Sequence, residues 1–265
     1  MTTVAVIGGG VMGETLVAGM LRNGWDAGDV AIAEKRADHA ATLRDRHGVE
    51  VGDIDAVVRS ADVVALVVKP QDLPAVLGEV AAHLAPSALV VSLAAGVTTE
   101  TIEAALAPGT PVVRVMPNTP AQVGAGTAAI SPGAHPSEQH LELVEQLMAA
   151  VGHVVRVPES QQDAVTAVSG SGPAYVFLVA EAMIEAGVHL GLPRATATEL
   201  AVHTVRGAAT LLDESGTHPA LLREQVTSPA GTTAAALRAL EDHGLRSAFL
   251  AALEAARDRS RELAG

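Results

Sequence analysis

The feature that most constrains this chain is a glycine-rich turn close to its N-terminus. The apolar run Val4–Ile7 is typical of a short buried strand, and an amphipathic helix is predicted to begin near Val11. Between them, Gly8, Gly10 and Gly13 have the G-x-G-x-x-G spacing of a dinucleotide site. In that motif the first glycine permits a tight turn, the second lets a pyrophosphate approach bare backbone, and the third lets the helix pack close to the sheet. A glycine-rich turn that binds nothing is the alternative. The position between strand and helix favours a cofactor site made by Gly8, Gly10, Val11, Met12 and Gly13.

Composition narrows the classes of protein and of ligand. At 265 residues the chain can bury a sizeable core in one large or two modest domains. It has no cysteine, which excludes disulfides and thiolate metal sites, and its formal charge of -13 argues against nucleic acid or anionic membranes as partners. No basic region followed by a long apolar run lies near the N-terminus, so a cytoplasmic location is expected. Because a nicotinamide dinucleotide is itself an anion, its site must be made positive by helix N-termini and a few cations.

The first part of the chain alternates between strand and helix patterns. Such alternation is typical of an α/β fold with a mostly parallel, doubly wound sheet of the Rossmann type. We predict strands over residues 4–7, 30–33, 49–51, 63–68, 89–92, 112–115, 126–131 and 152–157, and helices over residues 11–23, 38–47 and 137–150.

Polar residues that follow the predicted strands are further candidates for cofactor contacts, because open α/β sheets bind ligands at the carboxyl ends of their strands. Glu34, Lys35 and Arg36 follow the second strand. An acidic residue there holds the ribose 2′-hydroxyl of NAD, whereas an arginine accommodates the 2′-phosphate of NADP, so the residues leave the cofactor open. Lys69 follows the fourth strand and, with Lys35, is one of only two lysines in the chain. Asn118 lies in a proline-bracketed loop after the sixth strand.

The second part of the chain is predicted to be helical. From about residue 159 it is rich in alanine and leucine with helical periodicity, so we place a Rossmann domain over residues 1–158 and a helical domain over residues 159–265. Ser171 is predicted to cap a helix over residues 174–190, with Pro173 in its first turn. That helix is apolar nearly all round, which predicts burial. With so few aromatic residues, the helical half is expected to complete its core against another subunit.

Polar residues recur along this helix at Glu181, Glu185 and His189, which argues against a membrane span. Glu185 and His189 have a spacing at which they could ligate a metal ion. An ordinary pair on the helix surface is the favoured interpretation, so no metal site is predicted.

A second motif, residues 225–233, is predicted to bind an anion. Ser228 is a good N-cap and Pro229 a good first helical residue. The N–H groups of the next residues then lack intrahelical partners and can bind a phosphate or a substrate carboxylate. A well-capped helix start that binds nothing is the alternative. The hydroxyls around the predicted site belong to Ser228, Thr232 and Thr233, and its N–H groups to Ala230, Gly231 and Thr232.

Seven segments resemble the pyrroline-5-carboxylate reductase family, in the family's order and over essentially the whole chain. Each alone is weak evidence, but their combination is highly specific. The segments are Gly8-Gly-Gly-Val-Met-Gly13, Val68-Lys-Pro-Gln71, Val91-Ser-Leu-Ala-Ala-Gly-Val97, Arg114-Val-Met-Pro-Asn-Thr-Pro120, Asp163-Ala-Val-Thr166, Ser169-Gly-Ser-Gly-Pro-Ala-Tyr175 and Thr227-Ser-Pro-Ala-Gly-Thr-Thr233.

The resemblance implies a Rossmann domain followed by a helical domain that intertwines with its partner in a homodimer, often assembled further into a ring of five dimers. It implies hydride transfer from NADPH or NADH to the C=N carbon of L-1-pyrroline-5-carboxylate, giving L-proline. The catalytic residue would be Thr233, whose hydroxyl would hydrogen-bond the ring nitrogen. By the same resemblance the substrate pocket would be made by Glu159, Ser169, Gly170, Ser171, Ser228, Gly231, Thr232 and Thr233, and the cofactor would also border Val68, Lys69, Pro70, Ala95, Asn118 and Gln225.

The sequence departs from the family pattern at two places. The family usually has glycine where this chain has Ala230. Alanine would be strained if this position needs a positive φ and harmless in the first turn of a helix, and we expect the helical turn. The family often carries an asparagine near the adenosine end of the cofactor, where this chain has Asp53-Ile-Asp-Ala56. The resemblance favours NADPH, but the residues themselves leave the choice between NADPH and NADH open.

Two other functions compete with this interpretation. A related imine reductase would act on another cyclic imine, and a β-hydroxyacid dehydrogenase would need a catalytic lysine in the helical half, where this chain has none. A non-catalytic dinucleotide sensor would need the glycine turn but not the polar residues from Ser228 to Thr233.

Overall fold

The computed structural model describes residues 2–264, which form two compact units. The first unit extends to Ser171 and includes the last turns of the chain from Ala256, and the second runs from Gly172 to Ala255. The predicted boundary at residues 158/159 follows the last strand, whereas the contacts within the chain divide it later, inside a continuous helical segment from Glu159 to His189.

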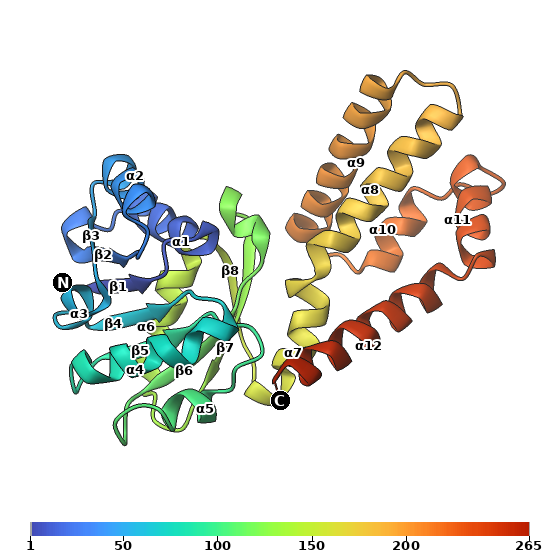
Figure 1. The fold of residues 1–265 in the computed structure, drawn as a ribbon. Helices are drawn as coiled ribbons and strands as arrows, with labels where there is room; N and C mark the ends of the chain where they lie inside the picture. Colours follow the sequence, from blue (N-terminus) through green and yellow to red (C-terminus); the bar gives the residue numbers. More distant parts are fainter. Residues whose placement is uncertain (1, 265) are drawn as a thin grey trace. The chain divides into compact units, whose positions relative to one another are not determined.

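The first unit contains one eight-stranded sheet with the order β3-β2-β1-β4-β5-β6-β7-β8 (Figure 1). Strands β1 to β6 are parallel, β7 is antiparallel to β6, and β8 is parallel to β7. The predicted doubly wound α/β sheet is therefore confirmed, with two strands added at one edge. The strands are β1 Val4–Ile7, β2 Val30–Ala33, β3 Glu50–Gly52, β4 Val63–Leu66, β5 Leu89–Ser92, β6 Val112–Met116, β7 Gly126–Pro132 and β8 Gly152–Arg156.

The central strands are buried on both faces, as their unbroken apolar sequences predict. Every residue of β1 and of β4 is buried. Val4 pairs with Val63 and Ile7 with Leu66, so both strands end at the same level. The turns that follow these strands therefore lie next to each other at the carboxyl edge of the sheet.

Helices cover both faces of this sheet (Figure 1). The core on one face contains Leu16, Met20, Leu43 and Leu147 from α1 (Val11–Arg22), α2 (Ala37–His47) and α6 (Glu138–Ala149). The core on the other face contains Val58, Leu77, Val80 and Ile102 from α3 (Ile54–Val58), α4 (Leu73–His83) and α5 (Thr99–Glu103). Short 3₁₀ turns are η1 Ala27–Asp29, η2 Pro70–Asp72, η3 Thr119–Val123 and η4 Glu159–Gln161.

The helix predicted to begin at a Ser171 cap instead continues from the preceding turn, so that prediction is wrong. Helix α7 (Gln162–Val165) runs through a π-helical turn, η5 (Thr166–Gly170), into α8 (Gly172–His189). Ser171 has helical dihedral angles, and its N–H donates to the Thr166 carbonyl oxygen at 2.8 Å, five residues earlier. The extra residue of the π turn lets the chain pass the glycines and Pro173 without leaving the helix.

The second unit is made of helices only. Its elements are α8, α9 (Arg194–Ser215), α10 (Pro219–Gln225), α11 (Thr232–Asp242) and the first part of α12 (Leu245–Ala264). Helices α8 and α9 pack side by side where Gly187 meets Ala197 (Figure 1). The predicted burial of α8 is wrong within a single chain, because Phe177 and Leu178 are each 65% exposed and the helix has no buried residue. Its apolar surface fits the expectation that another subunit completes this core.

One helical segment, from Glu159 to His189, is long and apolar enough to cross a membrane by length and composition. Glu185 in this segment forms a surface ion pair with Arg194 of α9 at 2.6 Å, and not the pair with His189 that the sequence suggested.

An ion cluster joins the first turn of α1 to the end of α2. The Glu14 carboxylate accepts hydrogen bonds from His47 Nε2 at 3.0 Å and from Arg46 Nη1. The hydrogen bond from His47, together with Arg46, holds the pKa of Glu14 below its ordinary value of 4.5, against the opposing effect of burial. Folding therefore gains stability from this group above the unfolded pKa, and loses it as the pH falls through the folded pKa.

We predict that Glu14→Gln flattens the acid limb of the stability profile between about pH 5 and pH 3. Thermal unfolding across this range measures the effect, and the matched control is Glu142→Gln, an exposed position in α6. Equal losses of Tm with falling pH in the wild type and in Glu14→Gln would contradict the prediction.

Candidate functional site

The glycine turn joins β1 to α1 in the conformation that a dinucleotide motif requires. Gly8 has φ +109°, and a Cβ there would lie 2.5 Å from the Val67 carbonyl oxygen. A Cβ on Gly13 would overlap the Gly8 carbonyl oxygen, so only glycine lets α1 start this close to β1. A Cβ on Gly10, the N-cap of α1, would meet nothing within 4 Å. This open side leaves the first N–H groups of α1, at its positive end, accessible to an anion.

A cavity of about 790 Å³ lies at the carboxyl edge of the sheet beside this turn. Residues that the sequence did not single out also line it, among them Gly52, Ala75 and Glu79. Val11, Met12 and Gly13 begin α1, and Pro70 begins η2, next to lining residues in the chain. The predicted cofactor residues that the structure brings together in this cavity are Gly8, Gly10, Glu34, Lys35, Arg36, Val68 and Lys69.

Glu34 and Arg36 form an ion pair at the wall of this cavity. Glu34 Oε1 accepts from the Arg36 backbone N–H at 2.9 Å and from Arg36 Nε at 3.3 Å. The Glu34 side chain is 8% exposed and the Arg36 side chain 60% exposed. The acidic group is therefore fixed against the glycine turn, where a Cβ on Gly9 would lie 3.1 Å from Glu34 Oε2. Most of the Arg36 side chain is exposed beyond this ion pair.

Two predicted cofactor residues lie elsewhere in the first unit. Ala95 is exposed in the loop after β5, next to Gly96 at φ +77°. Asn118 precedes η3, and its Oδ1 accepts from the Thr127 N–H at 2.8 Å. A further predicted cofactor residue, Gln225, is the last residue of α10 in the second unit.

Asn118 is hydrogen-bonded to the π turn, which carries the predicted substrate residues Ser169 and Gly170 and is followed by Ser171. Its Nδ2 donates to the Ser169 carbonyl oxygen at 3.1 Å. Four residues later the chain has Pro173, which has no N–H to offer that carbonyl in the helical ladder. The proline thus leaves an acceptor for Asn118, and this bond holds the backbone of Ser169 and Gly170 against the sheet edge. At the same place, Gly170 packs so close to Met116 that a Cβ would lie 2.5 Å from its Cε.

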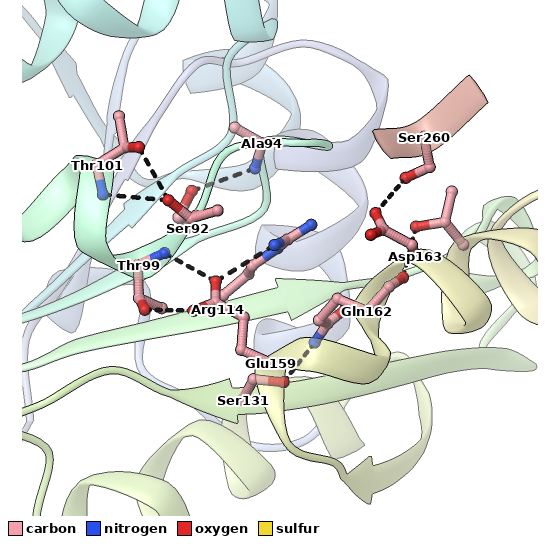
Figure 2. Close-up of polar contacts among 12 residues, drawn as sticks. Ser92, Ala94, Thr99, Thr101, Arg114, Ser131, Glu159, Gln162, Asp163 and Ser260 are labelled. Carbon is pink, nitrogen blue, oxygen red and sulfur yellow. Dashed lines mark hydrogen bonds and ion pairs between the residues drawn. The ribbon is translucent and has the colours of Figure 1, made fainter. Parts of the chain in front are cut away.

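Glu159, predicted to line the substrate pocket, is held on three sides within the first unit (Figure 2). Its Oε1 accepts from the Thr99 N–H at 2.8 Å and from Arg114 Nη1 at 3.2 Å, and its Oε2 accepts from Thr99 Oγ1 at 2.6 Å. The side chain of Glu159 keeps a quarter of its surface exposed, whereas that of Arg114 is only 5% exposed. Arg114 belongs to one of the seven family motifs, but the motif by itself predicts no role for it. Its charge inside the apolar strand Val112–Met116 is the feature of the sequence that indicates a buried ion pair.

The turn before α11 differs from the predicted capped helix start, and that prediction is wrong. Helix α11 begins at Thr232 with Gly231 as N-cap, so Ser228 does not cap it. Residues 228–231 form a tight turn, closed by the Gly231 N–H donating to the Ser228 carbonyl oxygen at 3.0 Å. Ala230 has φ +58°, the only positive φ of a non-glycine residue among residues 2–264, so the expectation of a harmless helical position is also wrong. Pro229 followed by a positive φ is typical of a type II turn, whose third position favours glycine.

The N–H groups available to an anion in this turn differ accordingly. The Gly231 N–H is used inside the turn, and the unpaired donors are those of the first turn of α11, which starts with Thr232 and Thr233. A Cβ on Gly231 would overlap Ser228 Oγ, so glycine allows this hydroxyl to lie beside the helix N-terminus. Ser228 Oγ and the N-terminus of α11 therefore lie together, with the helix starting later in the chain than predicted.

No group of three or more His, Asp or Glu side chains within residues 2–264 is arranged to hold a metal ion. The fold and the cavity together define the class, a dinucleotide-binding protein with a doubly wound sheet and a separate helical unit.

Comparison with known proteins gives the family. Residues 159–263 match the family model described as pyrroline-5-carboxylate reductase dimerisation, and residues 3–96 match the model described as NADP oxidoreductase coenzyme F420-dependent. A pyrroline-5-carboxylate reductase of Corynebacterium melassecola is 48% identical over 267 residues, covering 99% of both chains. One from Mycobacterium tuberculosis is 44% identical, covering 99% of this chain and 97% of the relative. The chain belongs to the pyrroline-5-carboxylate reductase family.

Solved structures agree over the whole length. The pyrroline-5-carboxylate reductase of Coxiella burnetii superposes with a TM-score of 0.96 at 39% identity, covering 100% of this chain and 99% of that one. The pyrroline carboxylate reductase of Plasmodium falciparum, solved with NADP bound, superposes with a TM-score of 0.87 at 26% identity, covering 100% and 98%. The match to a dimerisation domain supports homo-oligomerisation through the helical unit.

We predict that Ala230→Gly stabilises the protein. Alanine at a left-handed φ costs about 1–2 kcal/mol, and glycine loses about 0.5–1 kcal/mol of this gain through the entropy of the unfolded chain. The expected net gain of up to about 1 kcal/mol raises Tm by roughly 2–4 °C. Calorimetry of the wild type and the variant measures it.

The matched control is Ala236→Gly, in the middle of α11, which should lower stability by about 1 kcal/mol. A fall of Tm in both variants would contradict the strain at Ala230.

Proposed function

We propose that this protein reduces L-1-pyrroline-5-carboxylate to L-proline with NADPH or NADH, the last step of proline biosynthesis. The observation that carries the proposal is the 48% identity to a pyrroline-5-carboxylate reductase over the full length of the chain. The open glycine turn beside a cavity of about 790 Å³ supports it. The bound cofactor supplies the hydride, and the protonated imine of the substrate is already an electrophile. The protein therefore has to position two molecules and exclude water, and it needs little acid–base machinery.

The cofactor is assigned to the first unit. The N–H groups at the start of α1 take the pyrophosphate, since they lie at the positive end of a helix that only glycines bring close to the sheet. Glu34, Lys35 and Arg36 lie at the adenosine ribose. The other neighbours assigned in the first unit are Val68, Lys69, Pro70, Ala95 and Asn118, and Gln225 is assigned from the second unit.

The substrate carboxylate is assigned to the turn before α11. Ser228 and Gly231 place a hydroxyl and the helix N-terminus together, and Thr232 and Thr233 contribute N–H groups and hydroxyls. The Thr233 hydroxyl is assigned to the ring nitrogen as the catalytic residue. Glu159, Ser169, Gly170 and Ser171 are also assigned to substrate binding, by the family resemblance.

The assembly is proposed to be a homodimer built through the helical domain, residues 159–265, with five dimers in a ring. The exposed apolar side chains of α8 support an interface there. The Rossmann domain is taken as residues 1–158, because the last strand ends at Arg156. The expected location is the cytoplasm.

The first experiment is the initial rate of cofactor oxidation with L-1-pyrroline-5-carboxylate, run in parallel with NADPH and NADH, with proline identified as the product. Saturable oxidation that yields proline supports the proposal. Oxidation only with other cyclic imines would favour a related imine reductase, and cofactor binding without oxidation would favour a dinucleotide sensor.

We predict that Thr233→Ala lowers kcat/KM by roughly tenfold to a thousandfold, the effect of about one or two well-placed hydrogen bonds. Steady-state kinetics measure it. Thr42→Ala is the matched control, because the Thr42 hydroxyl bonds only the Asp38 carbonyl oxygen on the exposed side of α2. Wild-type kinetics in Thr233→Ala would remove Thr233 from the mechanism.

We predict that Glu34→Gln raises the ratio of kcat/KM for NADPH over that for NADH by about tenfold, equivalent to about 1.4 kcal/mol. The substitution removes a carboxylate that repels a 2′-phosphate and releases Arg36 from its ion pair. The control is Glu50→Gln, exposed at the start of β3 and away from the carboxyl edge. An unchanged ratio would show that Glu34 does not select the cofactor.

A further inference from the structure

A row of polar side chains crosses one face of the sheet at β5, β6 and β7. Arg114 pairs with Ser92 of β5 and with Ser131 of β7 in the strand register, and residues paired in this way point to the same face. Both serines are fully buried and Arg114 is 4% exposed. We call Ser92, Arg114 and Ser131 the polar row. The two small side chains leave room for the guanidinium between them.

The polar row holds two successive turns of the segment that follows β8. Arg114 Nη1 lies 3.2 Å from Glu159 Oε1, and Ser131 Oγ accepts from Gln162 Nε2 at 2.7 Å (Figure 2). Glu159 in turn receives both the N–H and the hydroxyl of Thr99, at the end of the loop that follows β5. The Glu159 carboxylate thus connects the β5–α5 loop, which carries Ala95, to the segment that leads to Ser169, and Arg114 fixes that carboxylate to β6.

A gain in folding stability does not by itself explain why Arg114 is buried in the sheet. Within residues 2–264, Arg114 Nη2 is buried without a protein partner, so Glu159 alone offsets the cost of burying the charge. Buried ion pairs with incomplete partners often contribute no more stability than apolar residues of similar size. What the pair does supply is a directional bond that fixes the Glu159 carboxylate on β6, where it accepts both hydrogen bonds from Thr99. An apolar contact would not fix the direction of this carboxylate.

From this geometry we infer that Arg114 is a positioning residue, which acts through Glu159 and Thr99 to hold the β5–α5 loop and the Glu159–Ser171 segment in register. The inference rests on the proposed function, in which these two segments border the nicotinamide and the substrate. Hydride transfer requires the reacting atoms at about 3–3.5 Å, and a misplacement of about 1 Å can cost about a hundredfold in rate. The glycine turn and Glu34 follow β1 and β2, which β4 and β5 separate from β6, so the adenosine end of the cofactor is expected to be independent of Arg114.

The test compares Arg114→Met with Arg114→Lys. Arg114→Met should lower kcat at least about tenfold while the Kd of NADPH, measured by fluorescence, stays within about threefold, and Arg114→Lys should recover part of kcat. Tm of Arg114→Met should fall, because Glu159 loses its cation, so kcat and Kd are compared at a temperature at which the variant is fully folded. A kcat within twofold of the wild type in Arg114→Met, or a Kd that weakens as much as kcat falls, would overturn the inference.

A second pair of variants covers failure of Arg114→Met to fold. Thr99→Val removes only the hydroxyl that Glu159 accepts, and Thr99→Ser keeps it. The control is Thr110→Val, which removes another buried hydroxyl, bonded to the Ala107 carbonyl oxygen before β6 at the opposite edge of the sheet. Thr99→Val should lower kcat several-fold, with Thr99→Ser and Thr110→Val near the wild type. Equal kcat in Thr99→Val and Thr99→Ser would overturn the inference.

Hydrogen exchange separates this inference from the proposed function, because it needs no turnover. Residues 93–99 and 159–171 should exchange faster in Arg114→Met or in Thr99→Val, while the α1 and α2 amides stay as in the wild type. Loss of protection confined to these segments supports the inference even if the wild type does not reduce the imine. Unchanged exchange there would reject it even if the wild type does.

Discussion

The contact on which the first unit depends is the close approach of α1 to the turn after β1. Gly13 lies so near the Gly8 carbonyl oxygen that no side chain fits between them, and Gly8 itself meets the Val67 carbonyl oxygen of the neighbouring strand. This approach brings the positive end of α1 to the carboxyl edge of the sheet, next to the turns after β2 and β4. The cavity, the Glu34–Arg36 pair and Lys69 all take their positions from these turns.

A second constraint is that the backbone N–H and C=O groups around Pro173 need hydrogen-bond partners. Pro173 cannot donate in the helical ladder, and the π turn before it shifts the bonding to five residues, as in Ser171 to Thr166. The Ser169 carbonyl is bound by Asn118 instead. An interruption that looked like a helix start in the sequence is therefore a continuous helix tied to the sheet. The tie places Ser169 and Gly170 where a ligand at the sheet edge can meet them.

The second unit, unlike the first, does not bury its large apolar side chains within one chain. Its helices expose large apolar side chains, including Phe177, Leu178 and Leu250, each about two-thirds accessible. A single chain has too few aromatic and aliphatic contacts to cover these faces, so the packing of α8 has to be completed outside the chain. The match of residues 159–263 to a dimerisation domain agrees with this surface. Tyr175 and Phe249 make an edge-on aromatic contact within the unit, with ring centroids 6.5 Å apart.

Local chemistry made part of this protein predictable from sequence. The period of apolar residues, the strand-to-helix switch at Gly8 and the order of seven motifs were enough for the doubly wound sheet, the helical half and the family. The strand, helix and turn patterns depend on residues a few positions apart, so their physics does not need the rest of the chain. The order of the motifs is a property of the sequence itself and needs no structure. The same reasoning identified Glu34, Arg36 and Lys69 as neighbours, because carboxyl ends of parallel strands meet at one edge.

Only the tertiary structure decided the features that depend on distant partners. Arg114 and Glu159 are 45 residues apart and Asn118 and Ser169 are 51 apart, so no local pattern reveals that they are bonded. The helix start at Thr232 and the positive φ of Ala230 also went against local preference, since Ser228 and Pro229 are good starting residues for a helix. At this turn the surrounding chain sets the backbone, and the intrinsic preference of alanine is overridden at a cost of about 1 kcal/mol. Sequence determines such conformations only through the whole fold, because the energy that stabilises them comes from contacts outside the segment.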